Sequence, residues 1–300
     1  MSIIKYEIVN KVAMENSFTQ AAQVLGLTQS AVSHAISSLE KQYGFALFHR
    51  NRAGLTITPE GEAMLRQMRR VLEAEELVQQ EATNLLGVAT GTIRIGVISS
   101  ISSSWMPGII HMMDQRFPGI KIELREGDYY EIERWLMNGE IEAGFLNTFE
   151  SEQFQYMPLR KDPLLCVVSE QSGFYHHTQI DIHELQDVPF ILIDYRGDND
   201  VRRLLASYHV KPYIRFLLSE EVGVLSMIKH HLGITILPQL SINALPRGLR
   251  VIPLQQGSYR TIGLALRKNP SPATKQFVAV LQDWIDEQYE NRIPSSPFLR

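Results

Sequence analysis

The first sixty residues carry apolar residues at helical spacing, separated by short polar breaks. Residues four positions apart predict a first helix: Ile4, Ile8 and Val12. A break at Asn16-Ser17 precedes a second, short helix that is expected to end at Gly26. Thr28 begins a third helix that ends at Gly44, and alternation over residues 55–58 predicts a short strand. This segment is therefore predicted to form a small, mainly helical domain.

A long helix is predicted to begin at Pro59, with Thr58 as its N-cap. The stretch from Glu62 to Leu86 contains no Gly or Pro. Apolar residues follow it in steps of three and four, interrupted once by Glu75, and form a heptad seam: Met64, Met68, Val71, Val78, Ala82 and Leu85. A helix of about 27 residues is ~40 Å long, too long to bury this seam on a 58-residue domain. We therefore predict that Met64, Met68, Val71, Val78 and Leu85 form a dimer interface.

Beyond the glycines at 87 and 91, short apolar strands alternate with helices for about 210 residues. Strands are expected at 92–98, 120–125, 143–146, 164–168, 190–193, 214–218, 234–237 and 261–266. Helices are expected at 105–116, 129–138, 198–207, 220–231 and 272–288. This alternation predicts a parallel-rich α/β architecture, long enough for two lobes with a crevice between them.

Composition changes this picture little. The 300 residues carry a net charge of −4. A single cysteine cannot form a disulfide within the chain, so no feature indicates an oxidising compartment. The first residues include Lys5, Glu7 and Lys11, and no run of about 18 apolar residues occurs, so we expect a cytoplasmic protein without a membrane partner. Residues 41–70 hold six Lys or Arg against two Glu, which favours one local surface for a polyanion.

Several ordered motifs carry a family resemblance. They are SFTQAA at 17–22, LTQSAVS at 27–33, ISSLE at 36–40, LFHR at 47–50 and LTITPEG at 55–61. Together they resemble the winged helix-turn-helix domain of LysR-type transcriptional regulators. Weaker likenesses to the same family follow in TIRIG at 92–96, FP at 117–118, and LGI at 232–234 followed by LP at 237–238.

The resemblance implies a multidomain α+β fold in three parts. Residues 1–58 would form the winged helix-turn-helix domain, 59–88 the linker and dimerisation helix, and 89–300 the effector-binding domain. The last would resemble periplasmic binding proteins, with lobe I at 89–161 and 266–300 and lobe II at 162–265. A small metabolite in the cleft would shift the DNA contacts, and two dimers would bind one promoter.

The third helix has the chemistry of a recognition helix, because short polar side chains near its start allow its backbone to enter the major groove. Gln29 suits adenine edges, and Ser33 and His34 suit base edges or phosphates. The Thr19 hydroxyl suits a phosphate. The family often carries Pro where Ser30 stands, and Arg or Gln where His34 stands. The expected DNA contacts are Thr19, Thr28, Gln29, Ser30, Ser33, His34, Ser37, Arg50 and Arg52. Two-fold symmetry makes an interrupted inverted repeat in double-stranded DNA the natural target.

The resemblance places the effector at the serine-rich loop after the first strand of the C-terminal domain. Hydroxyls and backbone N–H groups there would form an anion-binding corner, unless the loop only caps the next helix. The expected effector contacts are Ser99, Ser100, Ser102, Asn147, Tyr195 and Arg202. Arg196, Arg202 and Arg203 stand beside Asp194, Asp198 and Asp200, so the charge of the ligand stays open.

Other classes of function find little support. No G-x-S-x-G, H-E-x-x-H or P-loop motif occurs, so we expect no catalytic residues, no metal and no cofactor. Cys166 lies in an apolar strand and is expected to be inert, and one cysteine excludes the family's two-cysteine type of peroxide sensor. A ligand-independent LysR-like regulator and a cytosolic solute-binding protein without DNA function remain as alternatives.

Overall fold

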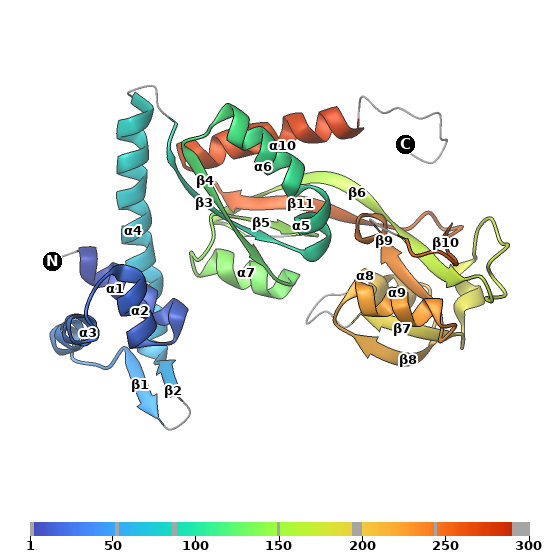
Figure 1. Cartoon of the computed structure of the whole chain (residues 1–300), viewed down its shortest axis with the longest axis horizontal. Coiled ribbons are helices and arrows are strands. Elements are labelled where there is room, and N and C mark those ends of the chain that lie inside the picture. Colours follow the sequence, from blue (N-terminus) through green and yellow to red (C-terminus); the bar gives the residue numbers. More distant parts are fainter. Residues whose placement is uncertain are drawn as a thin grey trace. The chain divides into compact units, whose positions relative to one another are not determined.

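The computed structural model describes residues 3–51, 54–85, 89–148, 151–193, 200–242 and 245–289 (Figure 1). The chain divides into two compact units. The N-terminal unit is Met1–Gly91 with Asn138–Glu140, and the C-terminal unit is Thr92–Met137 with Ile141–Arg300. No helix among the described residues is long and apolar enough to cross a membrane.

The N-terminal unit contains the predicted helices and strand. Its elements in order are α1 (Ile3–Glu15), α2 (Phe18–Leu25), α3 (Gln29–Tyr43), β1 (Phe48–Asn51), β2 (Gly54–Ile57) and α4 (Pro59–Leu85). The Ser17 hydroxyl caps α2 and the Thr28 hydroxyl caps α3, each accepting a backbone N–H three residues on. Gly26 and Gly44 end these helices at φ values of 66° and 82°, which glycine adopts without strain.

The start of α4 is fixed by two tight contacts. The Thr58 hydroxyl accepts the Gly61 N–H at 2.8 Å and donates to the Ala46 carbonyl at 2.8 Å. A Cβ atom on Gly61 would lie 2.2 Å from the Leu47 carbonyl oxygen, so only glycine fits there. Thr58 is 2% exposed, which makes this cap part of the core. The predicted N-cap is confirmed.

The predicted seam of α4 separates into two parts. Met68 is 2% exposed and lies in the core formed by α1, α2 and α3, against which Met64 also packs. Its assignment to a dimer interface is therefore wrong, because its side chain is already buried within one chain. Val71, Val78 and Leu85 are 42%, 66% and 79% exposed, so their role in dimerisation stays a prediction.

The described residues of the C-terminal unit form a seven-stranded sheet in the order β10-β6-β11-β5-β3-β4, with β9 also paired to β6. The strands are β3 (Gly91–Val97), β4 (Ile120–Glu126), β5 (Ala143–Leu146), β6 (Phe154–Ser169), β9 (Thr235–Pro238), β10 (Leu249–Pro253) and β11 (Tyr259–Arg267). A separate parallel pair is formed by β7 (Pro189–Ile193) and β8 (Tyr213–Leu218).

Six α-helices accompany these strands in the described part of the unit. They are α5 (Ser99–Ser104), α6 (Met106–Arg116), α7 (Tyr129–Met137), α8 (Asp200–Ser207), α9 (Glu221–Lys229) and α10 (Pro272–Tyr289). Short 3-10 helices occur at Ile182–Leu185 and Gln239–Ser241. Trp105, Phe145 and Trp284 gather in one aromatic cluster, with ring centroids about 6 Å apart.

The long strand β6 runs through both lobes (Figure 1). Its first part, 154–163, pairs with β11, and its second part, 164–169, pairs with β9 and β10. The first lobe therefore contains β3, β4, β5, β11 and the start of β6, and the second lobe contains the remaining strands. The change of partner falls close to the predicted lobe boundary at 161/162.

Two expectations about this unit need correction. All of β11 pairs within the first lobe, so lobe II ends before Tyr259 and not at residue 265. The sheet is also mixed and not parallel-rich. The pairs β3–β5 and β7–β8 are parallel, whereas β6 is antiparallel to β9, β10 and β11. Alternation of strands and helices does not reveal a strand such as β11 that returns to the first lobe.

Candidate functional site

The first half of α3 presents polar side chains on an exposed face. Gln29, Ser30, His34 and Ser37 are exposed, and Ser33 is half-buried. The hydroxyls of Thr28 and Ser30 lie 3.0 Å apart and share a hydrogen bond. Thr19 is exposed in the first turn of α2. These residues can reach base edges and phosphates without a bulky side chain holding the helix away from DNA.

The opposite face of α3 holds this surface in place. Val32, Ile36 and Leu39 are at most 2% exposed and pack in the core of the N-terminal unit. Lys5 of α1 donates to the Ser38 hydroxyl at 2.8 Å, which adds a polar tie between α1 and α3.

Glu40 connects α3 to the following hairpin, and sequence reasoning missed this role. Its carboxylate accepts the backbone N–H groups of Leu47 and Phe48 at 2.8 and 3.3 Å. The only signal in the sequence is an acidic side chain beside an otherwise basic stretch.

The wing is an antiparallel hairpin of β1 and β2. Arg50 pairs with Leu55 and His49 pairs with Thr56 in its register. The backbone of Arg50 therefore lies in β1, as the wing assignment requires. Arg52 lies outside the described residues, so its predicted DNA contact stays a prediction.

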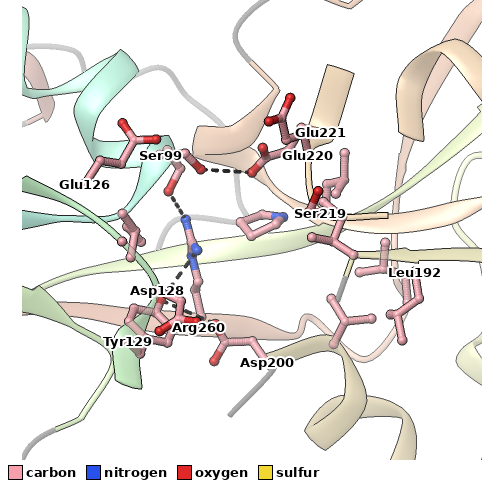
Figure 2. A pocket seen from close by; sticks show the side chains of 18 of the residues that line it. Ser99, Glu126, Asp128, Tyr129, Leu192, Asp200, Ser219, Glu220, Glu221 and Arg260 are labelled. Carbon is pink, nitrogen blue, oxygen red and sulfur yellow. Dashed lines mark hydrogen bonds between the residues drawn. The ribbon is translucent and has the colours of Figure 1, made fainter. Parts of the chain in front are cut away.

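The C-terminal unit contains a cavity of about 640 Å³ with walls from both lobes (Figure 2). The first lobe contributes Ile98, Ser99 and Ser100 after β3 and a group between β4 and α7: Glu126, Gly127, Asp128, Tyr129 and Glu131. The second lobe contributes Leu192, Ile193, Asp200, Val201, Ser219, Glu220, Glu221, Val222, Ile236, Leu237 and Pro238. Arg260 of β11 completes the lining.

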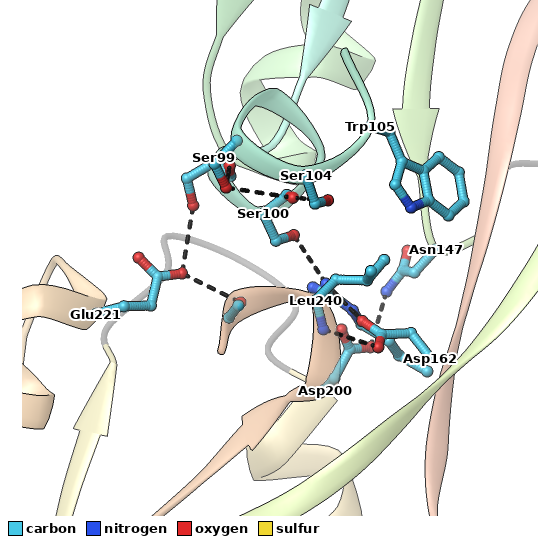
Figure 3. Close-up of polar contacts among 12 residues, drawn as sticks. Ser99, Ser100, Ser104, Trp105, Asn147, Asp162, Asp200, Glu221 and Leu240 are labelled. Atoms are coloured by element: carbon cyan, nitrogen blue, oxygen red, sulfur yellow. Dashed lines mark hydrogen bonds and ion pairs between the residues drawn. The ribbon is translucent and has the colours of Figure 1, made fainter. Parts of the chain in front are cut away.

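Arg260 is the hub of a buried polar network at this cavity (Figure 2), and Figure 3 shows Ser100, Asp162 and Leu240 of the same network. Its guanidinium contacts the Asp162 carboxylate at 2.8 Å through both Nε and Nη2. Nη2 also donates to the Ser100 hydroxyl at 2.8 Å, and Nη1 donates to the Tyr129 hydroxyl at 3.5 Å. The Leu240 N–H donates to the other Asp162 oxygen at 3.1 Å. The network ties β6 and β11 to α5, a short helix that stands where a serine-rich loop was expected.

Burial is the largest single influence on the pKa of each of these three groups. It raises the pKa of Asp162, while Arg260 and the Leu240 N–H oppose that rise. Desolvation by itself would lower the pKa of Arg260, but the oxygens of Tyr129, Asp162 and Asp200 raise it above its ordinary value. Burial also raises the pKa of Tyr129, so its hydroxyl stays protonated and can donate.

Three further hydrogen bonds cross between the lobes. The Ser99 hydroxyl donates to the Glu221 carboxylate at 3.3 Å. Asp200, at the start of α8, accepts from the Asn147 amide at 3.3 Å and from the Tyr129 hydroxyl at 3.5 Å. The lobes therefore meet across the cavity through hydrogen bonds, which can exchange for contacts to a ligand or to water.

The structure places the predicted effector residues unequally. Ser99 and Ser100 line the cavity, Asn147 bonds the lining residue Asp200, and Ser102 and Arg202 are not among the lining residues. The effector contacts of all five residues stay predictions. Tyr195 lies outside the described residues. Sequence reasoning missed Arg260, Tyr129 and Asp162, because each sits far along the chain from the serine-rich loop and no local motif marks it.

Two protein families match most of the chain. Residues 5–62 match the family described as bacterial regulatory helix-turn-helix protein, lysR family, and residues 87–286 match the LysR substrate binding domain. The chain belongs to the LysR family of transcriptional regulators. A relative from Bacillus subtilis (strain 168), the uncharacterized HTH-type transcriptional regulator YvbU, is 31% identical over 288 residues, which cover 94% of this chain and 98% of the relative.

Solved structures of LysR-type regulators share the fold. A single-substitution variant of full-length OxyR from Pseudomonas aeruginosa has a TM-score of 0.75, with 22% identity and 95% coverage of both chains. Full-length CbnR complexed with its target DNA has a TM-score of 0.67, with 18% identity, and covers 95% of this chain and 100% of that one.

Membership of the LysR family decides several questions left open by the residues. This chain is a DNA-binding transcriptional regulator with a substrate-binding domain, and not an enzyme. The alternative of a solute-binding protein without DNA function is thereby set aside. In this LysR regulator, α2 and α3 fall within the matched helix-turn-helix region, and the cavity falls within the matched substrate-binding domain.

Proposed function

We propose that this LysR regulator binds an interrupted inverted repeat in a promoter, and that a small molecule between the two C-terminal lobes modulates that binding. The cavity carries the second part of the proposal, because its lining comes from both lobes. A ligand there would exchange for the contacts Ser99–Glu221 and Tyr129–Asp200 that now cross it. Binding energy at the cavity would thus act on the geometry between the lobes.

The DNA side of the proposal rests on the exposed polar face of α3. One such helix reads a half-site, so two copies are needed for the repeat. The exposed apolar residues Val71, Val78 and Leu85 of α4 are the candidate contact between two copies. We propose a dimer of dimers that acts in the cytoplasm, where the promoter is accessible.

A mobility-shift assay on DNA upstream of the protein's own gene tests the DNA part. Gln29→Ala and Ser33→Ala should each weaken specific binding by about 1–3 kcal/mol and leave non-specific binding nearly unchanged. Gln171→Ala, an exposed glutamine in the second lobe, is the matched control and should bind like the wild type. Equal specific affinity in all variants would refute the assignment of α3 as the reading helix.

Thermal unfolding with a metabolite panel tests the effector part. A ligand at one hundred times its dissociation constant should raise stability by about 2.7 kcal/mol. The same compound should alter the footprint on the operator. A stabilising compound that leaves the footprint unchanged would argue for a ligand-independent regulator.

A further inference from the structure

The cavity lining is strongly acidic. Among the described residues that line it, six carry carboxylates and one carries a cationic group. The six are Glu126, Asp128, Glu131, Asp200, Glu220 and Glu221, and the cation is Arg260. Residues 194–199, outside the described part of the chain, hold two Asp and one Arg, so their charges do not reverse the sign.

The cation is already matched within the protein. The Arg260 guanidinium bonds Asp162 through two nitrogens and donates to Ser100 and Tyr129. Asp162 is 1% exposed, and its carboxylate is in direct contact with the Arg260 guanidinium. An anionic ligand at Arg260 would have to displace a buried carboxylate, which costs far more than a surface contact returns.

Carboxylates of the protein already occupy some of the positions that favour anions. The Asp128 carboxylate accepts the Glu131 N–H in the first turn of α7, and Asp200 opens α8. Glu220 and Glu221 stand at the start of α9. The Ser99 hydroxyl, expected to contact the effector, donates to Glu221. Among the groups that could hold an anion, this hydroxyl and the first turn of α7 therefore already bond carboxylates, whereas α5 and α9 begin without a side-chain cap.

Two of the carboxylates remain available on opposite walls. Glu126 lies on the first-lobe side and Glu220 on the second-lobe side of the cavity (Figure 2). Both are exposed, neither has an ion-pair partner among the described residues, and Glu220 does not cap α9 with its side chain. The second lobe also contributes an apolar wall to the cavity: Leu192, Ile193, Val201, Ile236 and Leu237.

We infer that the effector of this cleft is an organic dication or polycation, with ammonium groups spaced along an alkyl chain. The inference rests on the proposed function of the cleft as an effector site. The ammonium groups would pair with Glu220 and Glu126, and the alkyl chain would lie on the apolar wall. Among the described residues, no group of three or more His, Cys, Asp or Glu is placed to hold a metal ion.

Three four-carbon probes test the class of ligand on the full chain. They are 1,4-diaminobutane, 1,4-butanediol and succinate, with spermidine as a longer amine. Isothermal titration and thermal unfolding should show binding of the two amines, weakening with added salt, and no binding of the diol or succinate. Binding of succinate without the amines would overturn the inference but leave the proposed effector site standing.

Two matched variants locate the amine. Glu220→Gln removes one carboxylate from the lining and should weaken amine binding about fivefold, as expected for a partly exposed ion pair. Glu133→Gln, on the exposed face of α7 and outside the lining, should leave the affinity unchanged. Equal affinity in wild type and Glu220→Gln, or no binding of either amine, would overturn the inference. If no compound of the wider panel binds while operator binding persists, the proposed effector function fails as well.

Discussion

Removing the charge of Arg260 is the sharpest test of how the C-terminal unit is held together. Arg260→Met keeps most of the aliphatic volume but deletes the guanidinium. The Asp162 carboxylate, 1% exposed, would then keep only the Leu240 N–H as a donor among its described contacts. Ser100 and Tyr129 would each lose a contact as well. Breaking a buried ion pair from one side costs about 3–5 kcal/mol, since the remaining charge is left without its partner.

This cost should be visible by fluorescence. The three tryptophans, Trp105, Trp135 and Trp284, all lie in the C-terminal unit, so their emission follows that unit alone. In a unit of this size, each kcal/mol of lost stability lowers the thermal unfolding midpoint by about 2–4 °C. Arg260→Met should therefore lower this midpoint by roughly 6–20 °C. Urea unfolding followed by the same emission gives the free energy directly.

Two controls separate the buried pair from a general effect of losing an arginine. Arg116→Met removes an exposed arginine that pairs with Asp283 and should cost at most about 1 kcal/mol. The double variant Arg260→Met with Asp162→Leu removes both charges and should recover much of the loss. A change below about 1 kcal/mol in Arg260→Met, or a double variant no more stable than the single one, would refute the reasoning.

Three other perturbations test separate parts of the structure. Thr58→Ala removes the cap that accepts the Gly61 N–H and should lower the stability of the N-terminal unit by about 1–2 kcal/mol in far-UV circular dichroism, whereas an unchanged transition would deny the cap a role. Burial raises the pKa of the Cys166 thiol to about 12, so a thiol reagent should modify it only on unfolding. The unfolded thiol ionises near pH 9 or below, so its contribution to stability should fall as pH rises toward 12, and Cys166→Ala should remove this slope. Val78→Asp should dissociate dimers in sedimentation without lowering the stability of the fold. Met68→Ala should lower that stability by about 2–5 kcal/mol and leave dimers intact. The reverse outcome would place Met68, and not Val78, in the dimer interface.

Local chemistry made the N-terminal unit readable from the sequence. The caps at Ser17, Thr28 and Thr58 bond to backbone N–H groups three residues away, and each lies beside the helix that it starts. Glycine at positions 26 and 44 marks the helix ends, because it adopts positive φ without cost. A helix start or end that depends on three or four neighbouring residues can therefore be recognised from the sequence.

The apolar seam of α4 shows what a local pattern does not determine. Met68 and Val78 both continue the heptad pattern, yet Met68 is 2% and Val78 66% exposed. Periodicity identifies the apolar face of a helix but not the surface that covers it. Only the packing of α1, α2 and α3 against the first half of α4 decided which residues belong to the core.

The sequence by itself determined the helix-turn-helix and the long helix, because each is a local pattern of residues, whereas the serine-rich stretch expected as a loop is helix α5. Tertiary structure alone decided the interior of the cleft. Ser100, Asp162 and Arg260 are separated by 62 and 98 residues along the chain, and they meet only because β11 returns to the first lobe beside β6. Their pairing also neutralises the lone cationic side chain among the described lining residues with a carboxylate brought from elsewhere in the fold.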